Sequence, residues 1–189
     1  MDTVSPFEHV SVPVSIILGL GITQLLMSLH RLVQARERVK PYWLPLLWAA
    51  VMFVAQVEWW WSSYAMREET IWNFFYFLFV LLSPVTLYLA AAFVLPEIEK
   101  GERYDLKEYD YASRGWFFAF VAAGPVLDAI RRGIQAGSYT DFGAVSNAIS
   151  AVMLGSPAVS RNERYHAAVT IAVTLLFLSF IVSAALQLR

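Results

Sequence analysis

The chain has 189 residues, of which 58% are hydrophobic and only 15% are charged, and its formal net charge is -1. An ordinary soluble domain is about half apolar and about one quarter charged, so this composition predicts an integral membrane protein. The near-neutral charge, without a long run of Lys and Arg, argues against nucleic acid as a partner. Because the sequence contains no cysteine, disulfides, thiolate metal sites and Cys-ligated iron–sulfur clusters are excluded.

The first predicted span covers residues 10–32, VSVPVSIILGLGITQLLMSLHRL. The residues before it include two acids and no Lys or Arg, unlike the basic start of a cleavable signal peptide, so we expect the span to stay in the mature protein. The connection that follows, RLVQARERVKPY, holds four basic residues against one glutamate. Short loops rich in Lys and Arg stay cytoplasmic, so the N-terminus is expected outside.

The second and third predicted spans cover residues 43–64 and 71–95, and only AMREET separates them, which predicts a tight outer hairpin. Pro84 lies inside the third span and predicts a kink, because proline removes one backbone hydrogen bond. Residues 97–114, EIEKGERYDLKEYDYASR, carry mixed charges that suit a cytoplasmic loop or a short surface helix. This segment is either the docking site of a protein partner or a solvated connector.

The second half of the chain holds three further predicted spans, at residues 116–134, 142–160 and 167–186. Gly124 and Pro125 interrupt the fourth, and its two consecutive arginines would lie outside, against the positive-inside tendency. The fifth has small residues every four positions, which share one helix face and predict close helix packing: Gly143, Asn147, Ala151 and Gly155. The sequence therefore predicts one all-α transmembrane domain over residues 1–189, with about six spans, in the lipid bilayer of the cytoplasmic membrane.

Glu58 is the first candidate for a functional residue, because an ionisable side chain within a span is costly and marks a functional hypothesis by default. It lies about 15 residues after the start of its span, roughly 22 Å along the helix axis, which places it in the outer third of the bilayer. Trp59, Trp60 and Trp61 follow directly, and tryptophan is typical of the membrane interface. Two interpretations remain: an aromatic belt with a solvated carboxylate, or a pocket for an ion, a proton or a ligand.

Asp128 is the second candidate, and it precedes Arg131 and Arg132 by three and four residues, so all three can pair along one helix face. The alternative is a transport site beside the helix break at Gly124-Pro125.

The first predicted span has a face of small and polar residues that includes Gly19, and this face either packs against another helix or lines a polar pathway. The predicted polar pathway comprises Glu58, Gln56, Gln24, Thr23, Ser15 and Asp128.

The three histidines, His9, His30 and His166, raise the possibility of a haem or metal site. His9 and His30 are 21 positions apart, roughly 31 Å along a helix, so they cannot share one site. His30 and His166 are both expected near the cytoplasmic face. The sequence shows no catalytic motif, and we expect no cofactor and no metal.

Three functions are compatible with these features. The first is a channel or transporter for a proton or small cation, with its polar patch around Glu58. The second is a non-catalytic scaffold or accessory subunit that forms oligomers and recruits a partner through residues 97–114. The third is a small redox protein that holds haem or quinone.

Overall fold

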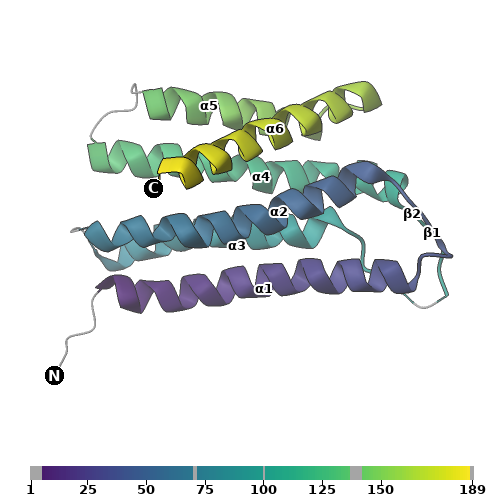
Figure 1. Ribbon diagram of the computed structural model, residues 1–189, viewed down its shortest axis with the longest axis horizontal. Coiled ribbons are helices and arrows are strands. Elements are labelled where there is room, and N and C mark those ends of the chain that lie inside the picture. Colours follow the sequence, from purple (N-terminus) through teal and green to yellow (C-terminus); the bar gives the residue numbers. More distant parts are fainter. Residues whose placement is uncertain (1–5, 70–71, 100, 137–141, 188–189) are drawn as a thin grey trace.

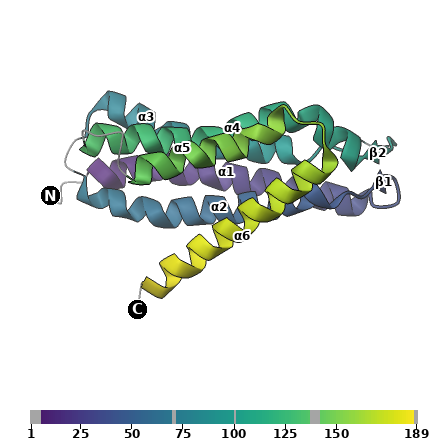
Figure 2. The same ribbon diagram turned by 90° about the horizontal axis from the view of Figure 1, so that it is seen from above.

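The computed structural model describes residues 6–69, 72–99, 101–136 and 142–187, and almost all of this part of the chain is helical. This part holds six α-helices, which are α1 (Pro6–Gln34), α2 (Trp43–Ser62), α3 (Phe74–Val94), α4 (Leu106–Ala136), α5 (Phe142–Gly155) and α6 (Glu163–Gln187). Helices α1 to α5 run side by side along the long axis of the molecule, while α6 crosses them obliquely (Figure 1 and Figure 2). Two short 3-10 helices, η1 (Ser63–Glu68) and η2 (Ser156–Ala158), extend α2 and α5. The predicted all-α class is confirmed.

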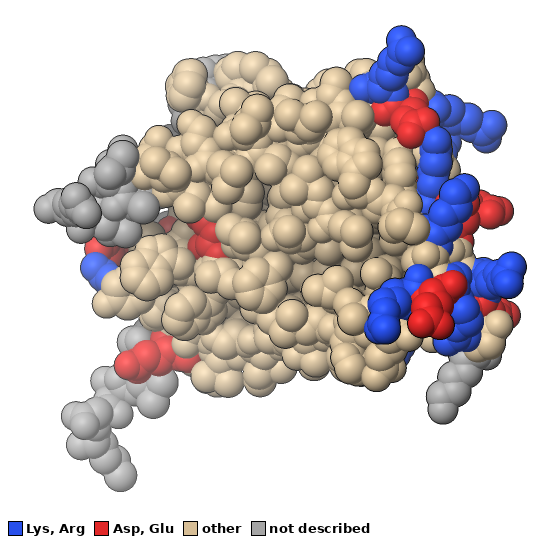
Figure 3. Space-filling model, turned by 45° about the vertical axis from the view of Figure 1, so that its right-hand side comes forward, with Lys and Arg blue, Asp and Glu red and all other residues tan. Residues whose placement is uncertain are grey.

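Four of these helices are long and apolar enough to cross a membrane, which suggests membrane association. The segments are Phe7–Gln34, Trp43–Glu68, Phe74–Val94 and Glu163–Ser183. The surface supports this, because Lys, Arg, Asp and Glu gather at the two ends and leave a broad uncharged band between them (Figure 3). By the same test of length and hydropathy, the described helices include four candidate spans, so the predicted count of about six is not confirmed. Helix α5 has only 14 residues, about 21 Å of helix, and the ends of α4 are too polar.

One end of the bundle is tied together by two short strands, β1 (Val39–Lys40) and β2 (Tyr104–Asp105), and is called the strand end below. The strands pair in parallel, with Val39 opposite Tyr104, and the Lys40 ammonium lies 2.9 Å from the Asp105 carboxylate. Helix α4 begins directly after β2, at Leu106, which is fully buried. Residues 106–114 of the predicted loop 97–114 are therefore helical, because their apolar residues pack on the strand end.

The main core lies in the half of the bundle nearer the strand end. Trp48 of α2 is only 2% exposed, and its ring meets Phe117 and Phe118 of α4 edge-on at centroid distances of 5.3 and 5.4 Å. Its indole N–H also donates a hydrogen bond of 3.0 Å to Thr170 of α6. One side chain therefore joins α2, α4 and α6. A smaller apolar cluster around Val14 and Val80 packs α1 against α3 at the opposite end.

Helix α6 stays with the bundle only over its first half. Its described buried residues are His166, Val169, Thr170 and Val173, all within its first three turns. Beyond them Leu175, Leu176 and Leu178 are exposed. Figure 2 shows the C-terminal part of α6 leading away from the other helices.

Candidate functional site

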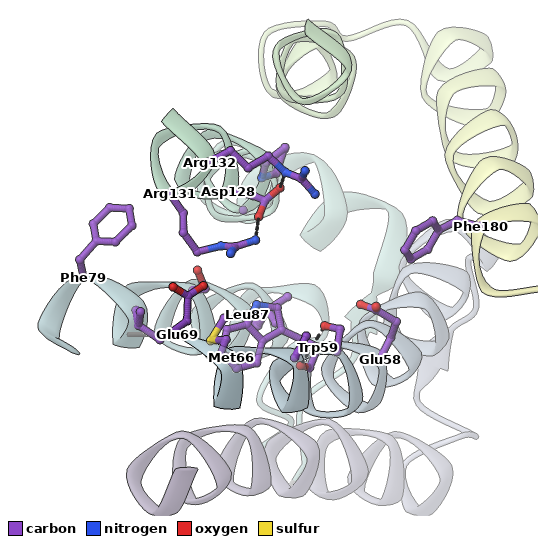
Figure 4. Close-up of a pocket in the computed structure, with 16 residues that line it drawn as sticks. Glu58, Trp59, Met66, Glu69, Phe79, Leu87, Asp128, Arg131, Arg132 and Phe180 are labelled. Atoms are coloured by element: carbon purple, nitrogen blue, oxygen red, sulfur yellow. Dashed lines mark hydrogen bonds and ion pairs between the residues drawn. The ribbon is translucent and has the colours of Figure 1, made fainter. Parts of the chain in front are cut away.

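A cavity of about 390 Å³ lies in the end of the bundle opposite the strand end, which is called the cavity end below. Helix α2 with η1, α3 and α4 surround it, and Phe180 of α6 closes one side (Figure 4). Its wall carries three carboxylates and two guanidinium groups, so its formal charge is -1; these are Glu58, Glu69, Asp128, Arg131 and Arg132. The structure therefore brings together the two acids, Glu58 and Asp128, that the sequence singles out.

Helix α4 contributes little side-chain volume to the cavity wall at Gly124 and Pro125. Gly124 has no side chain, and no atom lies within 4 Å of the place where its Cβ would be. Pro125 removes one backbone N–H from the helix interior. Both residues line the cavity, but α4 runs unbroken through them from Leu106 to Ala136, so the interruption predicted at Gly124 and Pro125 is wrong.

Asp128 is compensated on all sides. Its carboxylate accepts hydrogen bonds from Arg131 at 2.6 Å and from Arg132 at 2.8 Å, as their spacing on one helix face requires. A third hydrogen bond of 2.8 Å comes from the side-chain amide of Asn147 on α5. Asp128 therefore offsets one of the two arginine charges and joins α4 to α5.

Glu58 differs from Asp128 in lacking a cationic partner. It is half-buried, and within the described residues no Lys, Arg or His nitrogen forms an ion pair with it. The Ser62 hydroxyl, one helical turn later, is a hydrogen-bonding neighbour of its carboxylate. Figure 4 shows the carboxylate pointing away from α2, toward the space that Asp128 and Phe180 border. Glu58 is thus an acid of the cavity wall without an ion pair among the described residues.

The three tryptophans after Glu58 take different environments. Trp59 is half-buried and lines the cavity, whereas Trp60 and Trp61 are exposed. Trp60 reaches across to α1, where its indole N–H donates to the Ser15 hydroxyl at 3.2 Å. Three consecutive residues of a helix are spread over more than half of its circumference, so their side chains cannot all face the same side. One of the three rings, that of Trp59, therefore lies in the cavity wall.

Glu69 and Gln135 bring η1 and α4 together at the mouth of the cavity. The amide nitrogen of Gln135 contacts the Glu69 carboxylate and also donates to the Tyr76 hydroxyl at 3.2 Å. Sequence reasoning missed Glu69 because it lies in the polar connection between two predicted spans. Only the tertiary structure places it in the wall of the same cavity as Glu58 and Asp128.

The remaining residues of the predicted polar pathway lie elsewhere. Ser15 and Thr23 are on the exposed face of α1, and the Thr23 hydroxyl donates to the Gly19 carbonyl of its own helix at 2.8 Å. Gln24 is half-buried and does not line the cavity. Gln56 is fully buried, and its side-chain amide donates weakly to the Met52 carbonyl at 3.3 Å.

Close helix packing on α1 occurs at Gly21. A Cβ on Gly21 would overlap the side-chain oxygen of Gln56, whereas at Gly19 nothing lies within 4 Å of the Cβ position. On α5 the residues with small or polar side chains at four-residue spacing, Gly143, Asn147, Ala151 and Gly155, are all half-buried. A Cβ on Gly155 would come within 3.5 Å of Ala122 on α4, so this part of α5 lies against α4.

The histidines lie apart from the cavity. His166 is 2% exposed and packs between the rings of Tyr111 and Phe118, with its Nε2 2.9 Å from the Ser160 carbonyl. His9 and His30 are exposed on α1. Among the described residues, no group of three or more His, Asp or Glu side chains is placed to hold a metal ion.

The strand end holds one buried acid that the sequence did not single out, Asp110 of α4. It is 9% exposed, and burial raises its pKa to about 6 although the Arg114 guanidinium acts in the opposite direction. A shallow hollow nearby has its acid, Glu163, paired with the Lys107 ammonium at 2.6 Å. Of the acids that the structure describes, Glu58 therefore combines a place in a candidate membrane-spanning helix, a position in the cavity wall and no ion pair.

No protein-family model, no curated protein and no solved structure matches this chain.

Proposed function

We propose that this protein is a six-span membrane protein that moves a proton or a small cation through its cavity, with Glu58 as the site that the cation occupies. The observation that supports this is a half-buried carboxylate, inside a helix able to span the membrane, that faces a cavity and has no cationic partner among the described residues. Ionisable groups placed in this way mark ion and proton pathways in membrane proteins.

The packing of α4 and α5 supports six spans rather than four. Helix α4 has 31 residues, about 46 Å of helix, and runs beside α3 and α5 along the bundle (Figure 1). Its charged residues near the cavity end, Asp128, Arg131 and Arg132, line the cavity, and Asp128 also accepts a hydrogen bond from Asn147 of α5. A helix that is too polar for lipid contact can still span when its polar face is covered in this way.

The distribution of basic residues supports an orientation. Lys and Arg gather at the strand end (Figure 3), and this end contains both connections that the sequence predicts to be cytoplasmic. By the positive-inside rule, the strand end faces the cytoplasm, and the cavity and the N-terminus face outside.

The closed strand end favours a transporter over an open channel. Between the cavity and the strand end the bundle is filled by the core around Trp48, Phe117 and Phe118. A cation that reaches Glu58 from the outside therefore needs a rearrangement of the helices before it can leave inward. Alternating exposure of a fixed site is how secondary transporters work.

Flux through proteoliposomes tests the proposal. Proton and potassium flux is measured for wild type, for Glu58→Gln and for Glu68→Gln, at equal protein incorporation. Glu68 is the matched control, because it is an exposed acid of η1 outside the cavity lining. We expect flux from wild type and Glu68→Gln, and a loss of at least roughly tenfold in Glu58→Gln, which removes the charge and keeps the shape.

Equal flux from wild type and Glu58→Gln would reject the role of Glu58. Flux from none of the three proteins would reject transport of these ions, and would favour the accessory-subunit function with residues 97–114 as the partner site.

A further inference from the structure

The cavity has a size and a lining that bear on its substrate. We infer that the cavity prefers a singly charged organic cation with apolar substituents, such as a substituted ammonium, to a bare metal ion. This inference rests on the proposed function, since it names the substrate class of the same site.

The volume of the cavity fits an organic molecule. Small-molecule pockets occupy about 300–1,000 Å³, and the present cavity of about 390 Å³ lies within that range. Among the described residues, no group of three or more His, Asp or Glu side chains is placed to hold a bare metal ion.

The lining of the cavity fits the apolar part of such a cation. Around Glu58 the wall is built largely from aromatic and aliphatic side chains: Trp59, Met66, Phe79, Val80, Leu87 and Phe180. These groups cannot replace the water shell of a metal ion. They bind alkyl and aryl groups, and the face of an aromatic ring also attracts an ammonium group within about 6 Å.

The charges of the cavity select a single positive charge. Asp128 contacts Arg131 and Arg132 at 2.6 and 2.8 Å, so these three groups together carry a net charge of +1. Glu58 and Glu69 bring the formal charge of the wall to -1, and Glu69 contacts the neutral amide of Gln135. A singly charged cation at Glu58 would therefore balance the wall.

The position of Phe180 gives such a cation a route from the bilayer. Phe180 lines the cavity and is 56% exposed, and it lies on the part of α6 that leads away from the bundle (Figure 2). The wall on this side is therefore a single ring instead of a packed helix face. An amphiphilic cation dissolved in the outer leaflet enters past Phe180, a route closed to a hydrated metal ion.

Equilibrium dialysis of phenyltrimethylammonium against the purified full chain in detergent tests the inference. This probe has the shape of neutral tert-butylbenzene and differs from it in charge, so an excess of tert-butylbenzene serves as the competitor that lacks the cation. The variants are Glu58→Gln and Trp59→Leu, with Glu68→Gln and Trp61→Leu as matched controls, since Glu68 and Trp61 lie outside the cavity lining. Helical content and elution volume confirm that each variant is folded.

We expect saturable binding of one probe per chain to wild type and to both controls. Binding should weaken at least roughly tenfold in Glu58→Gln and in Trp59→Leu, and neither tert-butylbenzene nor exchange of sodium for potassium should displace the probe. Absence of saturable binding to wild type would overturn the inference, and so would equal binding to wild type and Glu58→Gln.

The two proposals fail separately. If phenyltrimethylammonium does not bind and potassium or proton flux still depends on Glu58, the organic-cation inference is wrong and the proposed function stands. If the probe binds at Glu58 and no potassium or proton flux is seen, the inference holds and the proposed ion is wrong.

Discussion

The two ends of the bundle differ in how their space is filled. At the strand end, β1 and β2 hold two connections together, and Trp48 packs against two phenylalanine rings while bonding to Thr170. At the cavity end, a space of about 390 Å³ separates α2 from α4, and its acids and arginines face one another across it. The same set of helices is therefore fixed at one end and open at the other.

This difference shows how a short chain can combine rigidity with a polar site. Aromatic side chains of high volume fill the packed half, whereas Gly124 and Pro125 leave room in the other half. Helix α6 follows the same division, because it is buried near the strand end and exposed beyond. Motion that opens or closes the cavity is accordingly expected in the cavity end, with the strand end as its fixed base.

The largest expected effect is at the packed half, in Trp48→Ala. Removing a buried tryptophan costs about 3–5 kcal/mol of unfolding free energy, from the cavity left behind and the lost contacts. The Thr170 hydroxyl also loses its donor. Equilibrium unfolding in mixed micelles, followed by circular dichroism, measures this loss. The control Trp61→Ala removes a ring that is 63% exposed and should change the stability by less than about 0.5 kcal/mol. Equal losses in the two variants would contradict the division into a packed and an open half.

A smaller effect, dependent on pH, is expected at Asp110. Its folded-state pKa of about 6 is raised by burial, so the folded protein holds the proton more tightly than the unfolded chain does. Stability from this group is therefore present at low pH and is lost as the pH rises from about 4 to about 6. At pH 8 we expect Asp110→Asn to be more stable than wild type by on the order of 2 kcal/mol, since it has no charge to bury.

Unfolding of wild type and Asp110→Asn at pH 5 and pH 8 checks this sign. The advantage of Asp110→Asn should shrink by about 1 kcal/mol at pH 5, where the native aspartic acid is largely protonated. An advantage that stays constant, or that grows at pH 5, would show that Asp110 is not the buried acid the structure describes.

The smallest effect distinguishes two glycines of α1. Gly21→Ala places a Cβ against the buried Gln56 side chain, near the level where the packed half meets the cavity, and should cost about 1–2 kcal/mol. Gly19→Ala meets open space and should raise stability by up to about 1 kcal/mol, because alanine favours helix. Unfolding of both variants in mixed micelles measures the difference. Equal changes would mean that α1 is rotated from the orientation seen here.

The sequence predicted the positions of most helices well. Long apolar runs indicated α1, α2, α3 and α6, and the Pro and charged residues between them marked the connections. The start of α4 was missed, because residues 106–114 are charged and read as a loop when their packing partners at the strand end are unknown. The number of spans was difficult to predict for a similar reason. Polar groups of α4 and α5 pair with each other, and a hydropathy profile along the sequence does not detect contacts between helices.

The candidate site was predicted only in part. Glu58 and Asp128 stand out in the sequence because a charge is costly beside apolar residues, and both line the cavity. Ser15, Thr23 and Gln24 also looked suitable, but the rotation of α1 directs two of them outward and keeps the third away from the cavity. A repeat of four residues identifies a shared face of a helix, and it does not say which neighbour that face meets.

By itself, the sequence determined the all-helical class, the apolar band and the presence of an acid beside three tryptophans, because these follow from composition and local order. The tertiary structure decided that, in the part of the chain it describes, Glu58 has no cationic partner while Asp128 has two. It also decided that Trp59 alone of the three tryptophans lines the cavity, and that Gly21 is the residue of close approach. The physical reason is that charge compensation and close packing depend on distances between helices that are far apart in the chain, and those distances are set by how the side chains of all six helices fit together.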